Sequence, residues 1–157
     1  MRLLNCETFK IETDFETIPP YAILSHRWIW IKRQELTFQE MENGTARECP
    51  GYKKIRFAAT QALRDGFSYV WLDTVCIDKT NHTEFSEAIN SMYQWYAESG
   101  TCYAYLADVA TKMDIPMSQW FTRGWTLQEL LAPPKSKFSP LDGSLLERGR
   151  TKICMSS

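Results

Sequence analysis

Three short apolar runs, separated by helical segments, constrain the fold of this chain most. The runs cover residues 21–25, 69–73 and 101–106, and polar residues stand at or directly after the end of each. Apolar strands that alternate with helices are typical of a parallel sheet whose two faces are both covered. The pattern therefore predicts an α/β fold with a doubly wound, mostly parallel sheet flanked by helices.

The segments between these runs show helical periodicity. Residues 52–65 place apolar side chains three and four apart, their basic residues mostly face outward, and Gly66 supplies a C-cap. A second helix is expected from Asn81 to about Glu98, and its apolar stripe is interpreted as core. A fourth short strand is expected at residues 136–139. The apolar positions are Ile55, Ala58, Ala59 and Ala62 in the first helix and Phe85, Ala88, Ile89, Met92 and Tyr96 in the second.

Composition narrows the classes of partner. The chain has 157 residues, a hydrophobic fraction of 44% and a net charge of −1, which predicts one globular domain without an electrostatic footprint for nucleic acid or anionic membrane. With no membrane-spanning run and no secretory signal pattern, we expect a soluble cytoplasmic protein. Five widely spaced cysteines without a Cys-x-x-Cys pair predict reduced thiols and no metal site.

Polar residues at the strand ends are the first site candidates. Ser25 and His26 end the first apolar run, and Asp73 ends the second. In open α/β sheets the ligand crevice lies at the carboxyl ends of the strands, so these side chains are candidates for ligand binding. The alternatives are a polar turn for the first pair and a helix or turn cap for Asp73.

Residues 120–134 contain the candidate catalytic group, Glu129, among Trp, Phe and Leu. The two prolines at 133 and 134 end any helix, which predicts a helix over residues 123–131 with Trp125 and Glu129 on one face. We expect Leu127, Leu130 and Leu131 to face the core. An indole wall would partly desolvate the acid and raise its pKa. The alternative is an ion pair of Glu129 with Arg123 or a surface lysine.

Four sequence blocks resemble the fungal heterokaryon incompatibility (HET) domain. They are residues 20–26, 69–79, 86–92 and 123–130, and the similarity covers the chain to about residue 138. The resemblance implies a domain at residues 1–140, a polar and possibly truncated tail at 141–157, and an effector of non-self recognition and cell death. Its implied partners are further copies of itself or other cell-death and recognition proteins. Residues 28–33 depart from the family pattern, and residues 28–36 are interpreted as a loop with a short strand.

The same blocks are distantly similar to the Toll-receptor-type (TIR) domain, which has a flavodoxin-like sheet and includes NAD-cleaving enzymes with a Trp-x-x-x-Glu helix. Trp125 and Glu129 fit that pattern, with Ser118 and Trp120 before it. This similarity implies that NAD is a substrate rather than a bound cofactor, that Glu129 is catalytic, and that Ser25, His26, Asp73 and Trp125 line the crevice. Two hypotheses follow: a self-associating signalling module, and an NAD(P) glycohydrolase.

Overall fold

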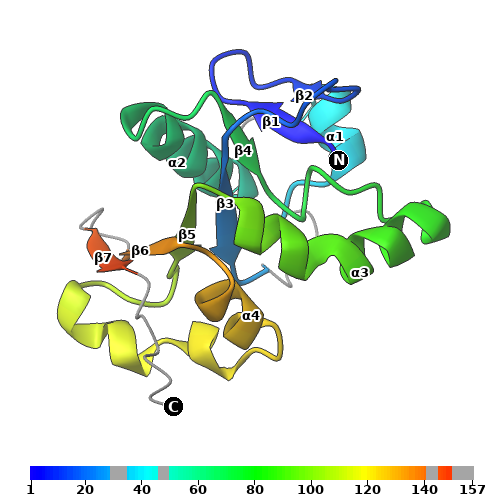
Figure 1. Cartoon of the computed structure of the whole chain (residues 1–157). Coiled ribbons are helices and arrows are strands. Elements are labelled where there is room, and N and C mark those ends of the chain that lie inside the picture. Colours follow the sequence, from blue (N-terminus) through cyan, green and yellow to red (C-terminus); the bar gives the residue numbers. More distant parts are fainter. Residues whose placement is uncertain (29–34, 46–49, 141–144, 150–157) are drawn as a thin grey trace.

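The computed structural model describes residues 1–28, 35–45, 50–140 and 145–149 as one seven-stranded sheet with helices around it (Figure 1). The order of the strands in the sheet is β2-β1-β4-β3-β5-β6-β7. The strands are β1 Leu3–Asn5, β2 Ile11–Glu12, β3 Tyr21–His26, β4 Tyr69–Trp71, β5 Thr101–Tyr105, β6 Lys135–Ser139 and β7 Leu146–Gly149. The α-helices are α1 Phe38–Glu42, α2 Pro50–Arg64, α3 His82–Glu98 and α4 Thr126–Leu131, and two 3-10 helices, η1 Lys112–Met117 and η2 Gln119–Thr122, precede α4.

The centre of the sheet is parallel and its edges are antiparallel. Strand β3 pairs in parallel with both β4 and β5, and β5 pairs in parallel with β6. The predicted parallel arrangement of the three apolar runs is therefore confirmed, and the fourth predicted strand is β6. The sheet as a whole is mixed, because β1 joins β4, β2 joins β1 and β7 joins β6 in antiparallel pairs. Strand β7 continues the sheet into the segment expected to be a polar tail.

Helices pack on both sides of the central strands. Phe57 of α2 contacts the rings of Tyr103 and Tyr105 on β5, whereas Trp95 and Tyr96 of α3 contact Trp71 on β4. In Figure 1, α2 and α3 accordingly lie on opposite sides of β3 and β4. All six residues of β3 are buried, as expected for a central strand that is covered on both faces.

Helices α2 and α3 lie where the periodicity predicts them. The four apolar positions of α2 are fully buried, and Gly66 beyond its end has the positive φ of 85° that favours glycine. Asn81 caps α3 by accepting a hydrogen bond from the backbone N–H of Glu84. Among the basic residues of α2, Lys54 is buried, because its ammonium group reaches the carboxylate of Glu35 at 2.5 Å.

Helix α4 is shorter than predicted, and of the three leucines expected to face the core, Leu130 packs against it and the other two do not. Trp125 stands at its N-cap position, and the side chains of Leu127 and Leu131 are 66% and 53% exposed. The expectation that both leucines face the core is wrong, because Glu129 occupies the buried side, where polar partners hold its carboxylate. The interpretation of residues 28–36 falls mostly on 29–34, outside the described residues. Within the described residues, no helix is both long and apolar enough to cross a membrane.

Candidate functional site

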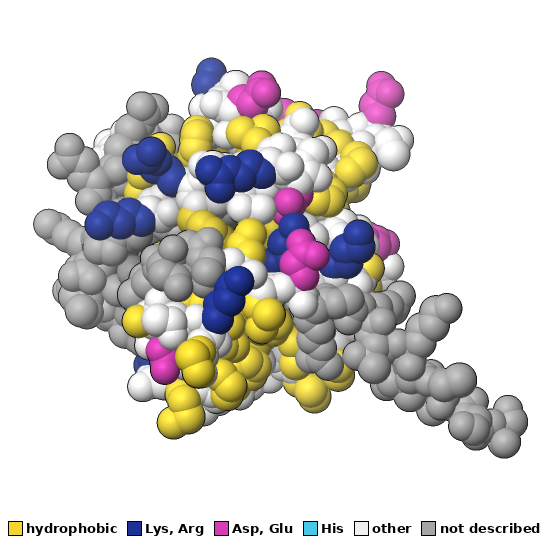
Figure 2. All heavy atoms as spheres, turned by 90° about the vertical axis from the view of Figure 1, so that its left-hand side faces the viewer, with side chains coloured by type: hydrophobic (Ala, Val, Ile, Leu, Met, Phe, Trp, Pro, Cys, Tyr) yellow, Lys and Arg dark blue, Asp and Glu magenta, His cyan; other side chains and the backbone are white. Residues whose placement is uncertain are grey.

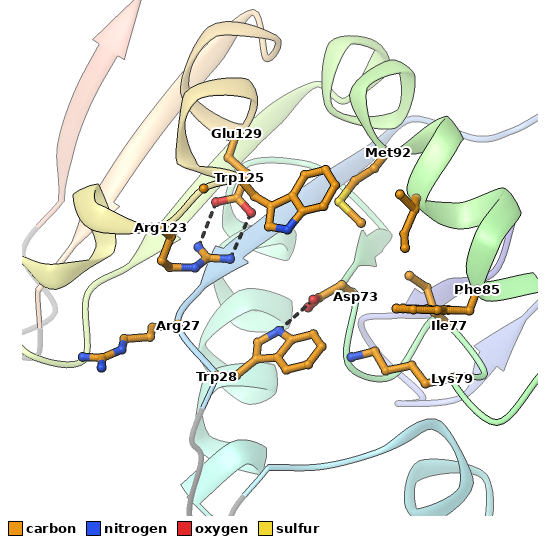
Figure 3. A pocket seen from close by; sticks show the side chains of 12 residues that line it. Arg27, Trp28, Asp73, Ile77, Lys79, Phe85, Met92, Arg123, Trp125 and Glu129 are labelled. Carbon is orange, nitrogen blue, oxygen red and sulfur yellow. Dashed lines mark hydrogen bonds and ion pairs between the residues drawn. The ribbon is translucent and has the colours of Figure 1, made fainter. Parts of the chain in front are cut away.

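A pocket of about 340 Å³ opens beside the carboxyl ends of β3 and β4 (Figure 3). Three parts of the chain that are distant in sequence form it: the segment after β3, the segment from the end of β4 into α3, and the start of α4. Its volume lies within the range of small-molecule sites. The lining residues are Arg27, Trp28, Asp73, Ile77, Lys79, Phe85, Ile89, Met92, Arg123, Gly124, Trp125 and Glu129.

Glu129 is the buried acid of this pocket, with only 4% of its surface exposed. Its carboxylate accepts two hydrogen bonds from the guanidinium of Arg123, at 2.9 and 3.2 Å. The hydroxyl of Ser25 donates a third, at 2.7 Å to Oε2. Glu129 therefore both lines a pocket at the strand ends and forms the ion pair with Arg123 that the sequence left as the alternative.

Two opposing effects set the pKa of Glu129. Burial raises it above the ordinary value for a glutamate, because desolvation disfavours the charged form. The charge and hydrogen bonds of Arg123, together with the bond from Ser25, lower it and only partly cancel the effect of burial. Asp73, which also lines the pocket, adds a smaller upward contribution. A carboxyl in this setting is a functional-site candidate on physical grounds.

Ser25 is a link between the sheet and α4. The indole Nε1 of Trp120 donates to Ser25 Oγ at 2.7 Å, and the Ser25 hydroxyl in turn donates to Glu129. Trp120 is buried, and its carbonyl oxygen accepts a bond from the hydroxyl of Thr126 in the first turn of α4. This chain of bonds fixes where α4 places Glu129. Ser25 lies behind the carboxylate rather than on the pocket wall.

Asp73 lies on the pocket wall below Glu129 in the view of Figure 3. Its carboxylate accepts a hydrogen bond from the indole Nε1 of Trp28 at 2.7 Å. This bond fixes the Trp28 ring at the pocket, where the ammonium group of Lys79 lies 3.5 Å from the ring centroid. The contact is a cation–π interaction at close range.

His26 is buried beside the pocket and does not line it. Neither ring nitrogen has a hydrogen-bond partner among the described residues. Its Nε2 is 3.8 Å from oxygens of both Glu35 and Asp73, which is too far for a hydrogen bond. Burial lowers the pKa of His26 well below its ordinary value, and the nearby cations Lys54, Arg123 and Lys79 lower it further. The imidazole is therefore neutral at pH 7.

The structure thus brings three of the other predicted site residues, Ser25, Asp73 and Trp125, together near Glu129, whereas His26 does not line the pocket. Sequence reasoning missed Trp28 and Lys79. Trp28 stands two residues beyond the end of β3, the signal that singled out Asp73, whereas Lys79 lies in the longer segment between β4 and α3. It also assigned Phe85, Ile89 and Met92 to the core. Phe85 and Met92 do pack against the core, and all three half-buried side chains also form the apolar wall of the pocket. Across the described ranges, no group of three or more His, Cys, Asp or Glu side chains is placed to hold a metal ion.

This arrangement suits a ligand with both apolar and charged parts. The indoles of Trp28 and Trp125 and the α3 wall offer planar and apolar contacts, while Glu129 offers a fixed negative charge. Arg27, Lys79 and Arg123 supply three cations against the two carboxylates of Asp73 and Glu129. A pocket with these groups can hold a ring, stabilise a positive centre and contact an anion.

Known proteins share much of this sequence. The family model described as Heterokaryon incompatibility protein (HET) matches residues 21–117. Vegetative incompatibility protein HET-E-1 of Podospora anserina is 49% identical over 132 residues, which cover 77% of this chain and 10% of that protein. The chain thus spans about a tenth of the length of this relative. No solved structure matches the chain. The residues matched by the family model include Ser25, Asp73 and Lys79, while Glu129 lies beyond them.

Proposed function

Because the chain belongs to the heterokaryon incompatibility (HET) family, we propose that it is an effector domain of fungal non-self recognition, in which its activation leads to cell death. The name of the relative from Podospora anserina, a vegetative incompatibility protein, supports this role. Since the chain corresponds to a tenth of that relative, the proposal concerns this domain and not the activity of the whole relative.

The pocket supports a chemical form of this role: cleavage of NAD(P) with Glu129 as the catalytic carboxylate. The observation that carries it is a buried acid, held in place by Ser25 and Arg123, that faces a pocket of ligand size. In this reaction the bond between C1′ of the ribose and the nicotinamide nitrogen breaks. Its electron pair leaves with nicotinamide, which becomes neutral, so the departure needs no general acid. Water then adds to C1′ and releases a proton.

Glu129 would act on the positive charge that develops at C1′. A carboxylate beside the ribose stabilises an oxocarbenium-like centre and can accept a hydrogen bond from a ribose hydroxyl. Because a carboxylate neutralised by arginine stabilises a cation less than a free one, the mechanism requires Arg123 to turn away when the ligand binds. Arg123 lines the pocket and is 21% exposed at its side chain, so a ligand in the pocket can contact it.

The arrangement of the parallel strands supports a doubly wound, TIR-like and flavodoxin-like fold. The order β4-β3-β5-β6 equals the order 2-1-3-4 that begins a flavodoxin-like sheet when β3 is counted as the first strand. In such sheets the ligand binds where successive connections run in opposite directions, which here is between β3 and β5. Ser25 of β3 stands at this point and contacts Glu129.

The purified domain tests the enzymatic proposal. Incubated with NAD at high protein concentration, it should release nicotinamide and ADP-ribose in equal amounts, as measured by liquid chromatography. Removal of the charge in Glu129→Gln should lower the rate about 100-fold or more, as for the loss of other groups that stabilise transition-state charge. Absence of nicotinamide release by the parent protein would contradict the enzymatic proposal.

A second candidate function, a signalling module that acts by self-association, is favoured by a separate feature. Exposed apolar side chains occur on η1, η2 and α4, and Figure 2 shows hydrophobic side chains gathered low on the face where η1 and η2 lie. Exposed apolar groups of this kind mark interaction surfaces. These side chains, called the exposed apolar patch below, are Met113, Met117, Phe121, Leu127 and Leu131, of which the two methionines are 90% and 83% exposed.

A further inference from the structure

Lys79 has a partly buried charge without an anionic partner in the described part of the chain. Its ammonium group contacts the face of Trp28, but neither Asp73 nor Glu35, the carboxylates that stabilise its charge from a distance, forms an ion pair with it. Burial lowers the pKa of Lys79 below the ordinary value. An aromatic face attracts the cation but accepts no conventional hydrogen bond, so the N–H donors of Lys79 remain available to a ligand.

The other two cations of the pocket already have partners. Arg123 forms the two bonds to Glu129, and the guanidinium of Arg27 donates to the side-chain oxygen of Gln119. Among the described residues, Lys79 is therefore the pocket cation whose N–H donors have no hydrogen-bond acceptor. It is also held in place, because Trp28 beneath it is fixed by its bond to Asp73.

The carboxylate of Glu129 and the ammonium group of Lys79 lie at different ends of the pocket. Figure 3 shows Glu129 with Arg123 and Trp125 at one end, Lys79 with Trp28 at the other, and the apolar side chains of α3 along the wall between them. A ligand that spans the pocket would thus meet a carboxylate at one end and an ammonium group at the other. This polarity fits a ribosyl compound that carries a cationic centre at C1′ and an anion further along.

We propose that Lys79 binds a phosphate group of the ligand, so that the pocket selects a nucleotide over the corresponding nucleoside. The inference rests on the NAD(P) cleavage proposed above, in which Glu129 lies beside the ribose, and adds where a phosphate group of the ligand binds. A lysine ammonium group is a compact charge with three donors, and hydrogen bonds between an ammonium group and a phosphate are among the stronger ones in proteins. Trp28 orients the lysine side chain before the ligand arrives.

Calorimetric titration with nicotinamide mononucleotide and with nicotinamide riboside tests this assignment, because the two compounds differ by one phosphate. The parent protein should bind the mononucleotide about tenfold more tightly or better, as expected for one charge-assisted hydrogen bond. Lys79→Met should abolish this preference, so that the ratio of the two affinities falls to about one. Lys79→Arg, which keeps the charge, should retain most of the preference.

Lys53→Met is the matched control, since it removes an exposed lysine of α2 outside the pocket and should keep the full preference. Equal affinity of the parent for both compounds, no binding of either at millimolar concentration, or a preference that survives Lys79→Met would each overturn the proposal. Nicotinamide release from NAD is measured in parallel with the same protein preparations. A domain that binds the mononucleotide through Lys79 but releases no nicotinamide from NAD would contradict the enzymatic function alone.

Discussion

At the scale of single residues, Ser25 and His26 are neighbours on β3 whose side chains meet different surroundings. Successive side chains of a strand point to opposite faces of the sheet. Ser25 faces α4 and contacts Glu129, whereas His26 lies near the buried Lys54 of α2, on the other side. The sequence could identify both as strand-end residues, but only the path of the chain around them decides that one supports the acid and the other is a buried neutral imidazole.

The buried His26 predicts that the protein loses stability in mild acid. Its pKa is lowered in the folded state, so between about pH 7 and pH 5 the unfolded chain binds a proton that the folded chain does not. The free energy of unfolding should fall as pH falls through the ordinary histidine value of about 6.5, by at most about 1.4 kcal/mol per pH unit for this group. Urea unfolding at several pH values measures it.

His26→Asn should flatten this dependence, whereas His82→Asn is the control, because His82 is exposed on α3 and should leave the slope unchanged. The chain has two histidines, so the two variants test every histidine in it. The same slope in all three proteins would show that His26 does not titrate in the way the structure indicates.

At the scale of elements, the position and the buried face of the long helices were predictable, whereas for α4 only the position was. Helices α2 and α3 carry several apolar residues at helical spacing, so their own sequences determine which face is buried. Helix α4 has six residues, too few for such a pattern. Its orientation depends on Ser25 and Trp120, which belong to other elements, and so the prediction that leucines near Glu129 face the core is right for Leu130 and wrong for the other two.

The junction of α3 and β5 provides a test of packing at this scale. A Cβ added at Gly100 would lie 2.3 Å from the ring of Phe67, whereas one added at Gly124 would meet nothing within 4 Å. Gly100→Ala should therefore lower the free energy of unfolding by about 1–3 kcal/mol through overpacking. Gly124→Ala should leave stability unchanged or raise it slightly. Equal stabilities of the two variants in urea would contradict this packing.

At the scale of the whole molecule, the pocket depends on strand order. The apolar runs predict buried strands and their separation predicts parallel pairs, but nothing local to a run states that β3 lies between β4 and β5. That order brings Asp73, Glu129 and the α3 wall to one opening. The antiparallel strands β1, β2 and β7 are short, and the sequence does not predict them because two to four residues carry too little pattern.

The exposed apolar patch predicts association of whole molecules. The parent domain should show a mass that rises with concentration in sedimentation experiments, because burying exposed methionine and leucine side chains is favourable. Met113→Ser combined with Met117→Ser should shift the equilibrium toward the monomer. Leu63→Ser, on the exposed surface of α2, should not. A parent that stays monomeric throughout would remove the support that the patch gives to the self-association function.

The central claim is that the domain acts through the carboxylate of Glu129, and toxicity in a fungal host tests it most directly. Glu129→Gln keeps the size of the side chain but leaves Arg123 without its charged partner, so some stability is lost as well. Ile55→Val on α2, outside the pocket, is the control for stability, because this change costs about 0.5–1.5 kcal/mol in a buried position. Circular dichroism verifies that both variants are folded.

The measurement is cell viability together with intracellular NAD after induction of each protein. The account predicts that the parent and Ile55→Val reduce both, and that folded Glu129→Gln reduces neither. A Glu129→Gln protein that kills as efficiently as the parent, or a parent that kills while NAD stays constant, would contradict it.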